Sequence, residues 1–373
     1  LLTGGDIASI TALLEGLRVD ALGFNCGLGP REMLPFLEEL RALSSLPILL
    51  QPNAGLPREV GGETVFDVNP DEFAALMEDC ARRGASLLGG CCGTTPAHIR
   101  ALTKRCAGIA PLPITQKRST VASSYARAVR FGEGKPVLIG ERINPTGKPR
   151  MKQALRDGDY DSILREGILQ QEQGVDALDV NAGLPELDEP AVLTALTEQL
   201  QAVTDLPLQL DSADPDALAR ALRVYNGKAI INSVSGKESS VSAVFPLAAR
   251  YGGVIVALTL DERGIPEDAE GRIAIARRIL ARGAEYGFKP HDFLFDPLTL
   301  TISSGSENAR VTLECVRRLH DELGVCTSLG VSNVSFGLPA RGYLNANFFA
   351  LALGAGLSAA ILNPHAPGMM EAA

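Results

Sequence analysis

The sequence SLLGGCCGTTPAHI, at residues 86–99, contains the unit from which the chain is built. It begins with an apolar run that predicts a buried strand, and Thr95-Pro96 supplies a cap and a proline that favour the start of a helix. The glycines between them allow a sharp turn and a close approach of the backbone to a ligand. Cys91 and Cys92 are therefore expected on the loop of a strand–loop–helix (βα) unit.

The same alternation occurs three times in residues 1–106. Apolar runs and apolar spacing predict these elements. The strands are at 19–25, 47–51 and 86–90, and the helices are at 30–43, 70–83 and 96–106. A closed barrel of parallel strands needs eight such units, so this region is expected to be part of an incomplete TIM-type barrel.

Residues 107–134 carry prolines, serines and charges without periodicity and predict an interdomain linker. In residues 135–373 the alternation resumes with eight predicted strands. They are at 137–140, 177–181, 207–211, 229–232, 254–258, 292–296, 326–331 and 359–362. Eight βα units predict a (β/α)8 TIM barrel, an α/β fold. An open doubly wound sheet is the alternative, although it usually has fewer strands.

Composition argues against several classes of protein. The 373 residues have a net charge of −9 and no basic cluster, which argues against a nucleic-acid partner. No apolar run approaches the roughly 18 residues of a transmembrane helix and no signal peptide is visible, so no membrane association is expected. The seven cysteines are interpreted as reduced thiols and metal ligands, which predicts a cytoplasmic protein.

Three of the cysteines are expected to converge. Cys26 ends the first predicted strand, and Cys91 and Cys92 follow the third, so all three thiols would lie at one carboxyl edge of a parallel sheet. Three protein ligands with a free fourth position are typical of catalytic zinc. Free cysteine is also commonly buried as a small apolar residue, and spacing alone leaves both interpretations open.

Polar side chains follow seven of the eight predicted strands of the second region. They include Glu141 and Asn144, Asp179 and Asn181, Asp211, Asn232, Asp296, Asn333 and Asn363. One such residue is usually a cap or a turn residue. Repetition around a barrel predicts instead a polar cup, without His or Cys, that binds a flat heterocycle through its ring nitrogens.

The first region resembles a known family. Phe24-Asn25-Cys26 and the GGCCGTTPAHI motif at 89–99 are similar to the zinc-dependent homocysteine S-methyltransferases. The resemblance implies zinc bound by Cys26, Cys91 and Cys92, with the sulfur of homocysteine as the fourth ligand. It also identifies residues 1–106 with the last three units of that barrel. We therefore expect a chain truncated at its amino end, and clipped at its carboxyl end because no clear eighth helix follows.

The second region resembles the pterin-binding domains. The motifs are GERINPTG at 140–147, DVNAG at 179–183, LDS at 210–212 and INS at 231–233. The resemblance implies that Asp211, Asn232 and Asp296 bind the pterin. Asn333 would approach the methyl-bearing nitrogen, and Arg341 would contact the pterin. Glu141, Asn144, Asp179 and Asn181 match the first two motifs and complete the expected binding set.

The order of the two regions resembles the cobalamin-dependent methionine synthase family. That resemblance implies methyl transfer from 5-methyltetrahydrofolate, through cobalamin, to zinc-bound homocysteine thiolate, giving methionine and tetrahydrofolate. The N5 amine of the substrate must gain positive character before its methyl group leaves. We assign this activation of N5 to Asn333, and the orientation of the ring to Asp211 and Asp296. No Asp-x-His-x-x-Gly motif occurs, so cobalamin would come from a domain of the same or another chain.

Two alternatives remain open from the sequence. The chain could be a folate-binding fragment without catalysis. It could also be a methyltetrahydrofolate–corrinoid methyltransferase without homocysteine activity. Zinc content separates the first alternative from methyl transfer through cobalamin to homocysteine. Dependence of turnover on homocysteine separates the second alternative from that reaction.

Overall fold

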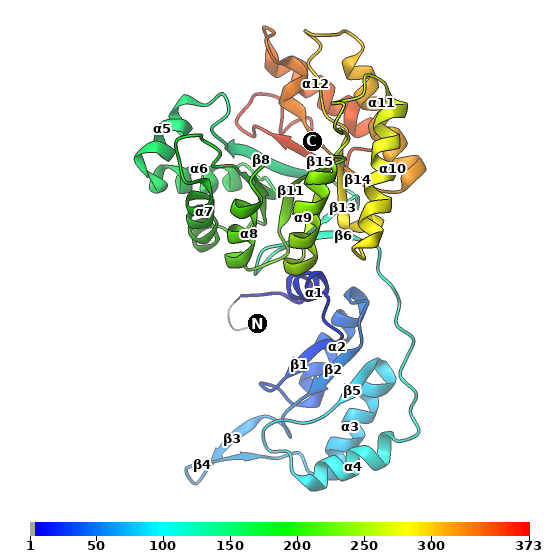
Figure 1. Cartoon of the computed structure of the whole chain (residues 1–373). Helices are drawn as coiled ribbons and strands as arrows, with labels where there is room; N and C mark the ends of the chain where they lie inside the picture. The colour runs from blue at the N-terminus through cyan, green and yellow to red at the C-terminus, as the bar shows by residue number, and fades with distance from the viewer. Residues whose placement is uncertain (1–3) are drawn as a thin grey trace. The chain divides into compact units, whose positions relative to one another are not determined.

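The structure is a computed structural model that describes residues 4–373. The chain forms two compact units (Figure 1). The larger unit combines the described residues up to Leu17 with Arg118–Ala373, and the smaller unit is Arg18–Lys117. No helix within residues 4–373 has both the length and the apolar character needed to cross a membrane.

The larger unit is a closed barrel of eight parallel strands, as the sequence predicts. The strands are β8 (Val137–Ile143), β9 (Ala177–Val180), β10 (Leu208–Asp211), β11 (Ile230–Ser235), β12 (Val254–Leu258), β13 (Phe293–Asp296), β14 (Cys326–Gly330) and β15 (Ala359–Leu362). They follow one another around the barrel in chain order, and β15 pairs with β8 to close it. The carboxyl ends of all eight strands therefore meet at one face.

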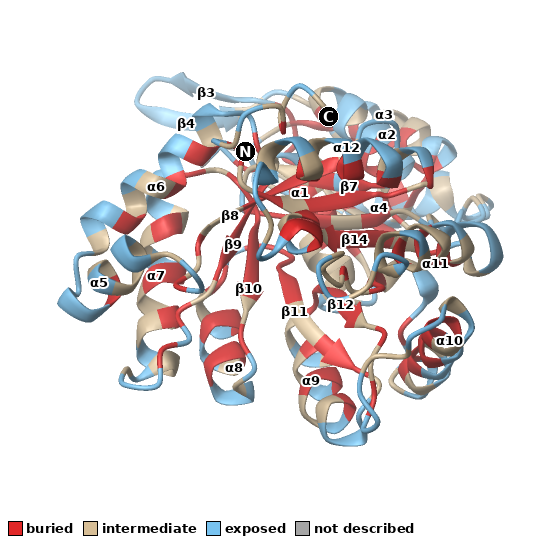
Figure 2. Ribbon diagram, turned by 90° about the horizontal axis from the view of Figure 1, so that it is seen from above, coloured by how far each residue is buried: buried red, intermediate tan, exposed pale blue. Residues whose placement is uncertain are grey.

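Helices surround the barrel and bury their apolar faces on the strands. They are α5 (Pro149–Asp157), α6 (Tyr160–Glu172), α7 (Glu189–Val203), α8 (Pro215–Val224), α9 (Glu238–Tyr251), α10 (Ala269–Glu285), α11 (Asn308–Leu323) and α12 (Arg341–Gly354). Aspartate side chains cap four of them, at Asp159, Asp188, Asp214 and Asp268. Figure 2 shows the strands as the buried centre of the unit and the outer sides of these helices as exposed.

A hairpin closes the amino-terminal end of the barrel. It consists of β6 (Thr120–Ser123) and β7 (Ala128–Phe131), and Phe131 packs in one apolar cluster with the inner residues of the barrel strands. Helix α1 (Ile7–Gly16) packs on this hairpin, and the Ser123 hydroxyl donates to the Ser9 carbonyl (3.3 Å). Residues 120–131 of the stretch expected as a linker therefore form a hairpin, and α1 groups with the larger unit rather than with the region 18–106.

The smaller unit contains the three expected βα units. Its parallel sheet has the order β1 (Leu22–Asn25), β2 (Ile48–Gln51), β5 (Ala85–Leu88), and its helices are α2 (Pro30–Leu43), α3 (Pro70–Arg83) and α4 (Pro96–Cys106). Asn69 caps α3 with its side chain. Thr95 and His98 form a reciprocal capping box at the start of α4. Proline follows each cap, which explains why the three helices begin where the sequence predicts.

A second hairpin, β3 (Pro57–Val60) and β4 (Glu63–Phe66), lies between β2 and α3. Its residues are almost all exposed, so they lack the apolar alternation that reveals a buried strand. The hairpin is therefore absent from the elements that the sequence predicts. At its base the Phe66 ring packs against Gly93, where a β-carbon would meet the ring at 2.4 Å. Glycine at 93 is therefore required for the hairpin to contact the cysteine loop.

Candidate functional site

Three thiols form a triangle in the smaller unit. The Sγ atoms of Cys26 and Cys92 are 3.6 Å apart, and those of Cys91 and Cys92 are 3.8 Å apart. All three sulfurs lie within 4.8 Å of one another. Zinc binds thiolate at about 2.3 Å in tetrahedral geometry, which separates two sulfur ligands by roughly 3.8 Å. The two sulfur separations at Cys92 therefore match an edge of a tetrahedral zinc site.

Backbone hydrogen bonds hold the two cysteine loops together. The Cys26 N–H donates to the Gln51 carbonyl (3.0 Å), and the Cys91 N–H donates to the Pro52 carbonyl (2.8 Å). The Cys92 N–H donates to Oδ1 of buried Asn53 (3.1 Å). The loop after β2 thus supports both thiol loops from the middle of the sheet. Asn53 follows a predicted strand, and that position is the signal that could have identified it.

The three thiols influence one another's ionisation. The Gly27 N–H, followed by hydrogen bonds from Cys91 and Cys92, lowers the pKa of Cys26. The pKa of Cys92 is raised to about 11, because its thiol is hydrogen-bonded to Cys26 and Cys91 and their charges oppose its ionisation. A cation among the sulfurs would relieve this opposition and favour all three thiolates.

Asp211 and Asn181 meet at the carboxyl face of the barrel. Asn181 donates through Nδ2 to Oδ2 of Asp211 (3.0 Å). Asp211 lies opposite Asn232 in the β10–β11 register, so the three side-chain positions are on neighbouring strand ends. Burial raises the pKa of Asp211 to about 6, against the stabilising hydrogen bond from Asn181. The carboxyl group can therefore change its protonation state close to neutral pH.

Asp179 lies deeper, beneath these residues. It is buried, and its Oδ1 accepts a hydrogen bond from Nε2 of Gln209 (2.7 Å). Burial and the neighbouring charge of Asp211 raise the pKa of Asp179, while hydrogen bonds from Gln209 and Asn144 oppose that rise. Its bonds go to the protein, so Asp179 supports the floor of the cup. Gln209 was missed by sequence reasoning, although it lies two residues before Asp211 and therefore on the same side of the strand.

Asp296 ends β13 in a buried position. Its Oδ1 accepts the Leu298 N–H (2.7 Å), and burial raises the pKa of its carboxyl to about 7. Several buried polar atoms of the barrel have no hydrogen-bond partner within residues 4–373, including Gln209 Oε1, Thr259 Oγ1, Thr299 Oγ1 and Ser328 Oγ. Unpartnered buried polar atoms are rare in folded proteins and indicate bound water or ligand.

Glu141 is directed by a bulge in β8. The β8–β9 register shifts between Gly140 and Ile143, and a β-carbon on Gly140 would meet the Gln170 side chain at 2.4 Å. Gln170 accepts the Arg142 N–H (3.0 Å) and so fixes the bend that carries Glu141. Glu141 accepts the Ser332 hydroxyl (3.2 Å), which connects the first strand end to the segment that contains Asn333.

The charge of Glu141 is balanced within the same loop. Burial raises the pKa of Glu141, and the nearby Lys148 ammonium is the largest opposing influence. Burial likewise lowers the pKa of Lys148, and Glu141 opposes that change. Lys148 was not selected from the sequence, although it directly follows the GERINPTG motif.

Asn333 lies on the short 3-10 helix η2 (Val331–Ser335) that follows β14. It is exposed, and its Nδ2 is close to the space above Gly330, 3.1 Å from where a β-carbon would stand. Arg341 donates to Ser335 Oγ (3.0 Å) and to the Ser332 carbonyl (2.8 Å). Arg341 therefore braces η2, and among the described residues it forms no ion pair with an acid.

The structure thus brings the site residues together in groups rather than in one network. Asn181 contacts Asp211, Asn144 and Gln209 contact Asp179, and Glu141 contacts Ser332. Within residues 4–373, Asn333 and Asp296 form no hydrogen bond with another predicted site residue. Both leave polar side-chain atoms available to a ligand at the carboxyl face.

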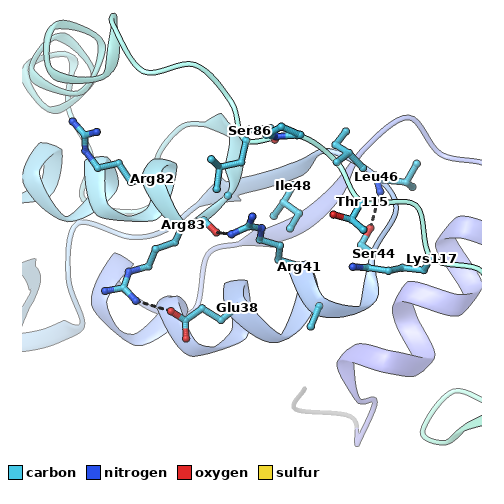
Figure 3. A pocket seen from close by; sticks show the side chains of 15 residues that line it. Glu38, Arg41, Ser44, Leu46, Ile48, Arg82, Arg83, Ser86, Thr115 and Lys117 are labelled. Carbon is cyan, nitrogen blue, oxygen red and sulfur yellow. Dashed lines mark hydrogen bonds and ion pairs between the residues drawn. The ribbon is translucent and has the colours of Figure 1, made fainter.

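The smaller unit also has a cavity of about 470 Å³ away from the thiols (Figure 3). It lies at the start of β2 and β5 and is lined by Arg41, Arg82, Arg83 and Lys117, among others. Arg83 pairs with Glu38 (2.7 Å), and Arg41 donates to the Arg83 carbonyl (3.0 Å). These guanidinium groups are bonded to the protein, and the cavity is at the opposite strand ends from the thiols.

Comparison with protein families assigns both regions. The model of homocysteine S-methyltransferases matches residues 1–106. The model of pterin-binding enzymes matches residues 140–363.

Two curated relatives match nearly the whole chain. The methionine synthase of Mycobacterium tuberculosis is 36% identical over 97% of this chain, which covers 32% of that protein. The methionine synthase of Mycobacterium leprae is 35% identical with the same coverage, 97% and 32%. The chain therefore spans about a third of the length of these relatives.

Solved structures resemble the chain in fold. A dihydropteroate synthase from Xanthomonas albilineans has a TM-score of 0.53 and 20% identity, covering 68% of this chain and 96% of that one. The 7,8-dihydropteroate synthase from Vibrio fischeri ES114 has a TM-score of 0.53 and 14% identity, covering 68% and 95%. At this identity the resemblance establishes the barrel fold alone.

Proposed function

Because the chain belongs to the pterin-binding enzyme family, we propose that it transfers the methyl group of 5-methyltetrahydrofolate toward homocysteine, yielding tetrahydrofolate and methionine. The observation that carries this proposal is the pair of strand-end acids in the barrel. Asp211 and Asp296 have pKa values raised by burial to about 6 and about 7. Buried acceptors of this kind suit the N–H groups at the edge of a pterin ring.

The remaining cup residues would orient the same ring. Asn181 fixes the rotamer of Asp211, and Asn232 occupies the neighbouring strand end. Glu141, Asn144, Asp179 and Arg341 would support the cup through the contacts described above. We assign ligand contact chiefly to Asp211, Asn232 and Asp296.

Asn333 would act on the reacting nitrogen. A methyl group on a tertiary amine departs only when the amine gains positive character. An amide can donate to N5 or accept from its protonated form by turning about its side chain. Asn333 is exposed on η2, and the Arg341 hydrogen bonds hold that helix in place. The residue can therefore follow the change in protonation of the substrate.

The thiol triangle would hold zinc for the second half of the reaction. Cys26, Cys91 and Cys92 supply soft ligands at tetrahedral spacing and leave the fourth direction for the homocysteine sulfur. Bound zinc would lower the pKa of that substrate thiol, so that it is a thiolate near neutral pH. Asn53 and the Pro52 carbonyl keep the cysteine loops in register.

The methyl group needs a carrier between two chemically separate sites. We propose that cobalamin, bound by a domain of the same or another chain, fulfils this role, and the greater length of the curated relatives supports it. We also propose a cytoplasmic location, which the seven free cysteines support.

Methyl transfer from 5-methyltetrahydrofolate to added cob(I)alamin tests the proposal. We expect Asp211→Asn and Asn333→Ala to reduce the rate by about 100-fold or more, because each removes a group that acts on the ring or on N5. Asp157→Asn and Asn226→Ala are matched controls at exposed positions and should keep the wild-type rate.

Binding of 5-methyltetrahydrofolate, measured in parallel by calorimetry, separates the outcomes. Binding without transfer by the wild-type chain would indicate a folate-binding module. Transfer that does not depend on homocysteine in the complete system would indicate a methyltetrahydrofolate–corrinoid methyltransferase. Absence of binding would overturn the pterin assignment.

A further inference from the structure

Arg272 is a fully buried arginine on α10, with 0% of its surface exposed. Its guanidinium crosses from the helix to the loop that follows β13. Nε donates to the Pro266 carbonyl, and Nη1 donates to the carbonyls of Pro297 and Leu298, each at 2.9 Å. No acid accepts a hydrogen bond from this guanidinium among the described residues. Its bonds therefore fix backbone rather than neutralise a charge.

The loop that Arg272 holds is the one that carries Asp296. Leu298 has a φ of +68°, a left-handed conformation that is unusual for a residue other than glycine. In that conformation its N–H donates to Oδ1 of Asp296 (2.7 Å). The Thr312 hydroxyl from α11 gives the Leu298 carbonyl a second, longer hydrogen bond (3.3 Å). An unfavoured backbone conformation at a functional site persists when its surroundings over-determine it.

We infer that Arg272 is a positioning residue of the pterin site: by clamping the Pro297 and Leu298 carbonyls, it fixes the Asp296 carboxyl group through the Leu298 N–H. This inference rests on the proposed function of Asp296. It explains why a costly buried cation is present here, since one rigid guanidinium binds the Pro266 carbonyl through Nε and the Pro297 and Leu298 carbonyls through Nη1. Lysine has one nitrogen and cannot bind the Pro266 carbonyl and the two loop carbonyls from two rigidly linked nitrogens.

Arg272 also acts on Asp296 through its charge. Burial is the main cause of the raised pKa of Asp296, and the Arg272 cation lowers it, as does the Leu298 hydrogen bond. The other titratable groups that face Arg272 are Asp268 at the start of α10 and Cys315 of α11, and burial raises the pKa of Cys315 to about 11, so its thiol is neutral from pH 5.5 to 8.5. Loss of the cation would therefore leave Asp296 protonated to higher pH.

The test is the affinity for 5-methyltetrahydrofolate of the full chain, measured by calorimetry from pH 5.5 to 8.5. We expect Arg272→Met to bind at least tenfold more weakly, with its pH midpoint moved upward. Arg272→Lys keeps the charge and loses the fork, so we expect a comparable loss of affinity with a smaller shift of the midpoint. Thr312→Val removes the lesser bond to Leu298 and should weaken binding by about threefold without moving the midpoint.

Cys315→Ala is the matched control, because Cys315 is equally buried beside Arg272 and forms no hydrogen bond with the Asp296 loop. It should lower the melting temperature and keep both affinity and midpoint. A folded Arg272→Met or Arg272→Lys with wild-type affinity overturns the inference. If neither folds, wild-type affinity in Thr312→Val overturns it. If Asp296→Asn loses 5-methyltetrahydrofolate binding while the Arg272 variants retain it, the inference about Arg272 is rejected and the proposed function stands. If the wild-type chain does not bind 5-methyltetrahydrofolate, the proposed function is rejected as well.

Discussion

The carboxyl group of Asp296 shows how burial of a proposed ligand-binding residue costs stability. Burial raises its pKa from an ordinary value near 3.8 to about 7. The folded state therefore holds this proton more tightly than the unfolded state does. Stability falls as pH rises from about 4 to 7, because ionisation is then easier in the unfolded chain. Above pH 7 the penalty is fully present, and there the carboxylate can accept hydrogen bonds from a ligand.

Asp296→Asn should consequently stabilise the chain while it removes pterin binding. We expect the gain in the free energy of unfolding to be at most about 4 kcal/mol at pH 8 and to vanish near pH 4. Urea denaturation at the two pH values measures it. Asp157→Asn, at an exposed position, is the control and should change little at either pH. A variant less stable than the wild type at pH 8 would contradict this assignment of the pKa.

Among the helices and strands, the sequence predicts those whose burial imposes a regular pattern of apolar residues. The eight barrel strands and helices α2, α3 and α4 were predicted within a few residues, because each has an apolar face or a cap with proline. The hairpins β3–β4 and β6–β7 were not predicted. The first is almost entirely exposed and lacks apolar alternation, and the second lies in a stretch whose prolines, serines and charges predict a linker.

The candidate site divides in the same way. Strand-end residues such as Asp211 can be predicted because topology alone brings them to one face. Asn53 and Gln209 could also have been identified, because Asn53 follows a predicted strand and Gln209 lies on the same side of its strand as Asp211. Arg272 acts through hydrogen bonds to backbone carbonyls of two loops, and the sequence carries little signal for it.

The contribution of the hairpin β6–β7 to the core of the barrel can be tested. Phe131 is 2% exposed within the cluster that closes the barrel. Phe131→Ala should lower the free energy of unfolding by roughly 3–5 kcal/mol, the usual cost of a large cavity in a core. Tyr343→Ala, at a position that is 80% exposed, should cost less than about 0.5 kcal/mol. Chemical denaturation compares the two, and equal costs would show that the hairpin is not part of the core.

For the whole molecule, the two candidate sites lie in different compact units, Arg18–Lys117 for the thiols and the barrel unit for the pterin cup. We therefore expect zinc and 5-methyltetrahydrofolate to bind independently. The hydrogen bond from Cys92 to Asn53 lies within the smaller unit. Those that hold Asp211 and Asp296 lie within the barrel unit.

Metal analysis and calorimetry test this independence. Zinc content should be near one per chain and should fall in Cys91→Ser and Cys92→Ser, whereas Cys106→Ser should leave it unchanged. A chelator should remove the zinc without altering the affinity for 5-methyltetrahydrofolate. Zinc at 100 times its dissociation constant should stabilise only one thermal transition, by about 2.7 kcal/mol. A change of folate affinity upon chelation would contradict the separation of the two sites.

The thiol triangle has a further consequence, for handling the protein in air. The sulfurs of Cys26 and Cys92 are 3.6 Å apart, whereas the two sulfurs of a disulfide are about 2.05 Å apart. The pKa of Cys26 is lowered, which favours the nucleophilic thiolate that begins oxidation. Without a metal, therefore, two of these thiols are well placed to form a disulfide. Protein with more bound metal should therefore lose fewer of these thiols to oxidation. A reductant should restore the metal-binding capacity that is lost during storage in air.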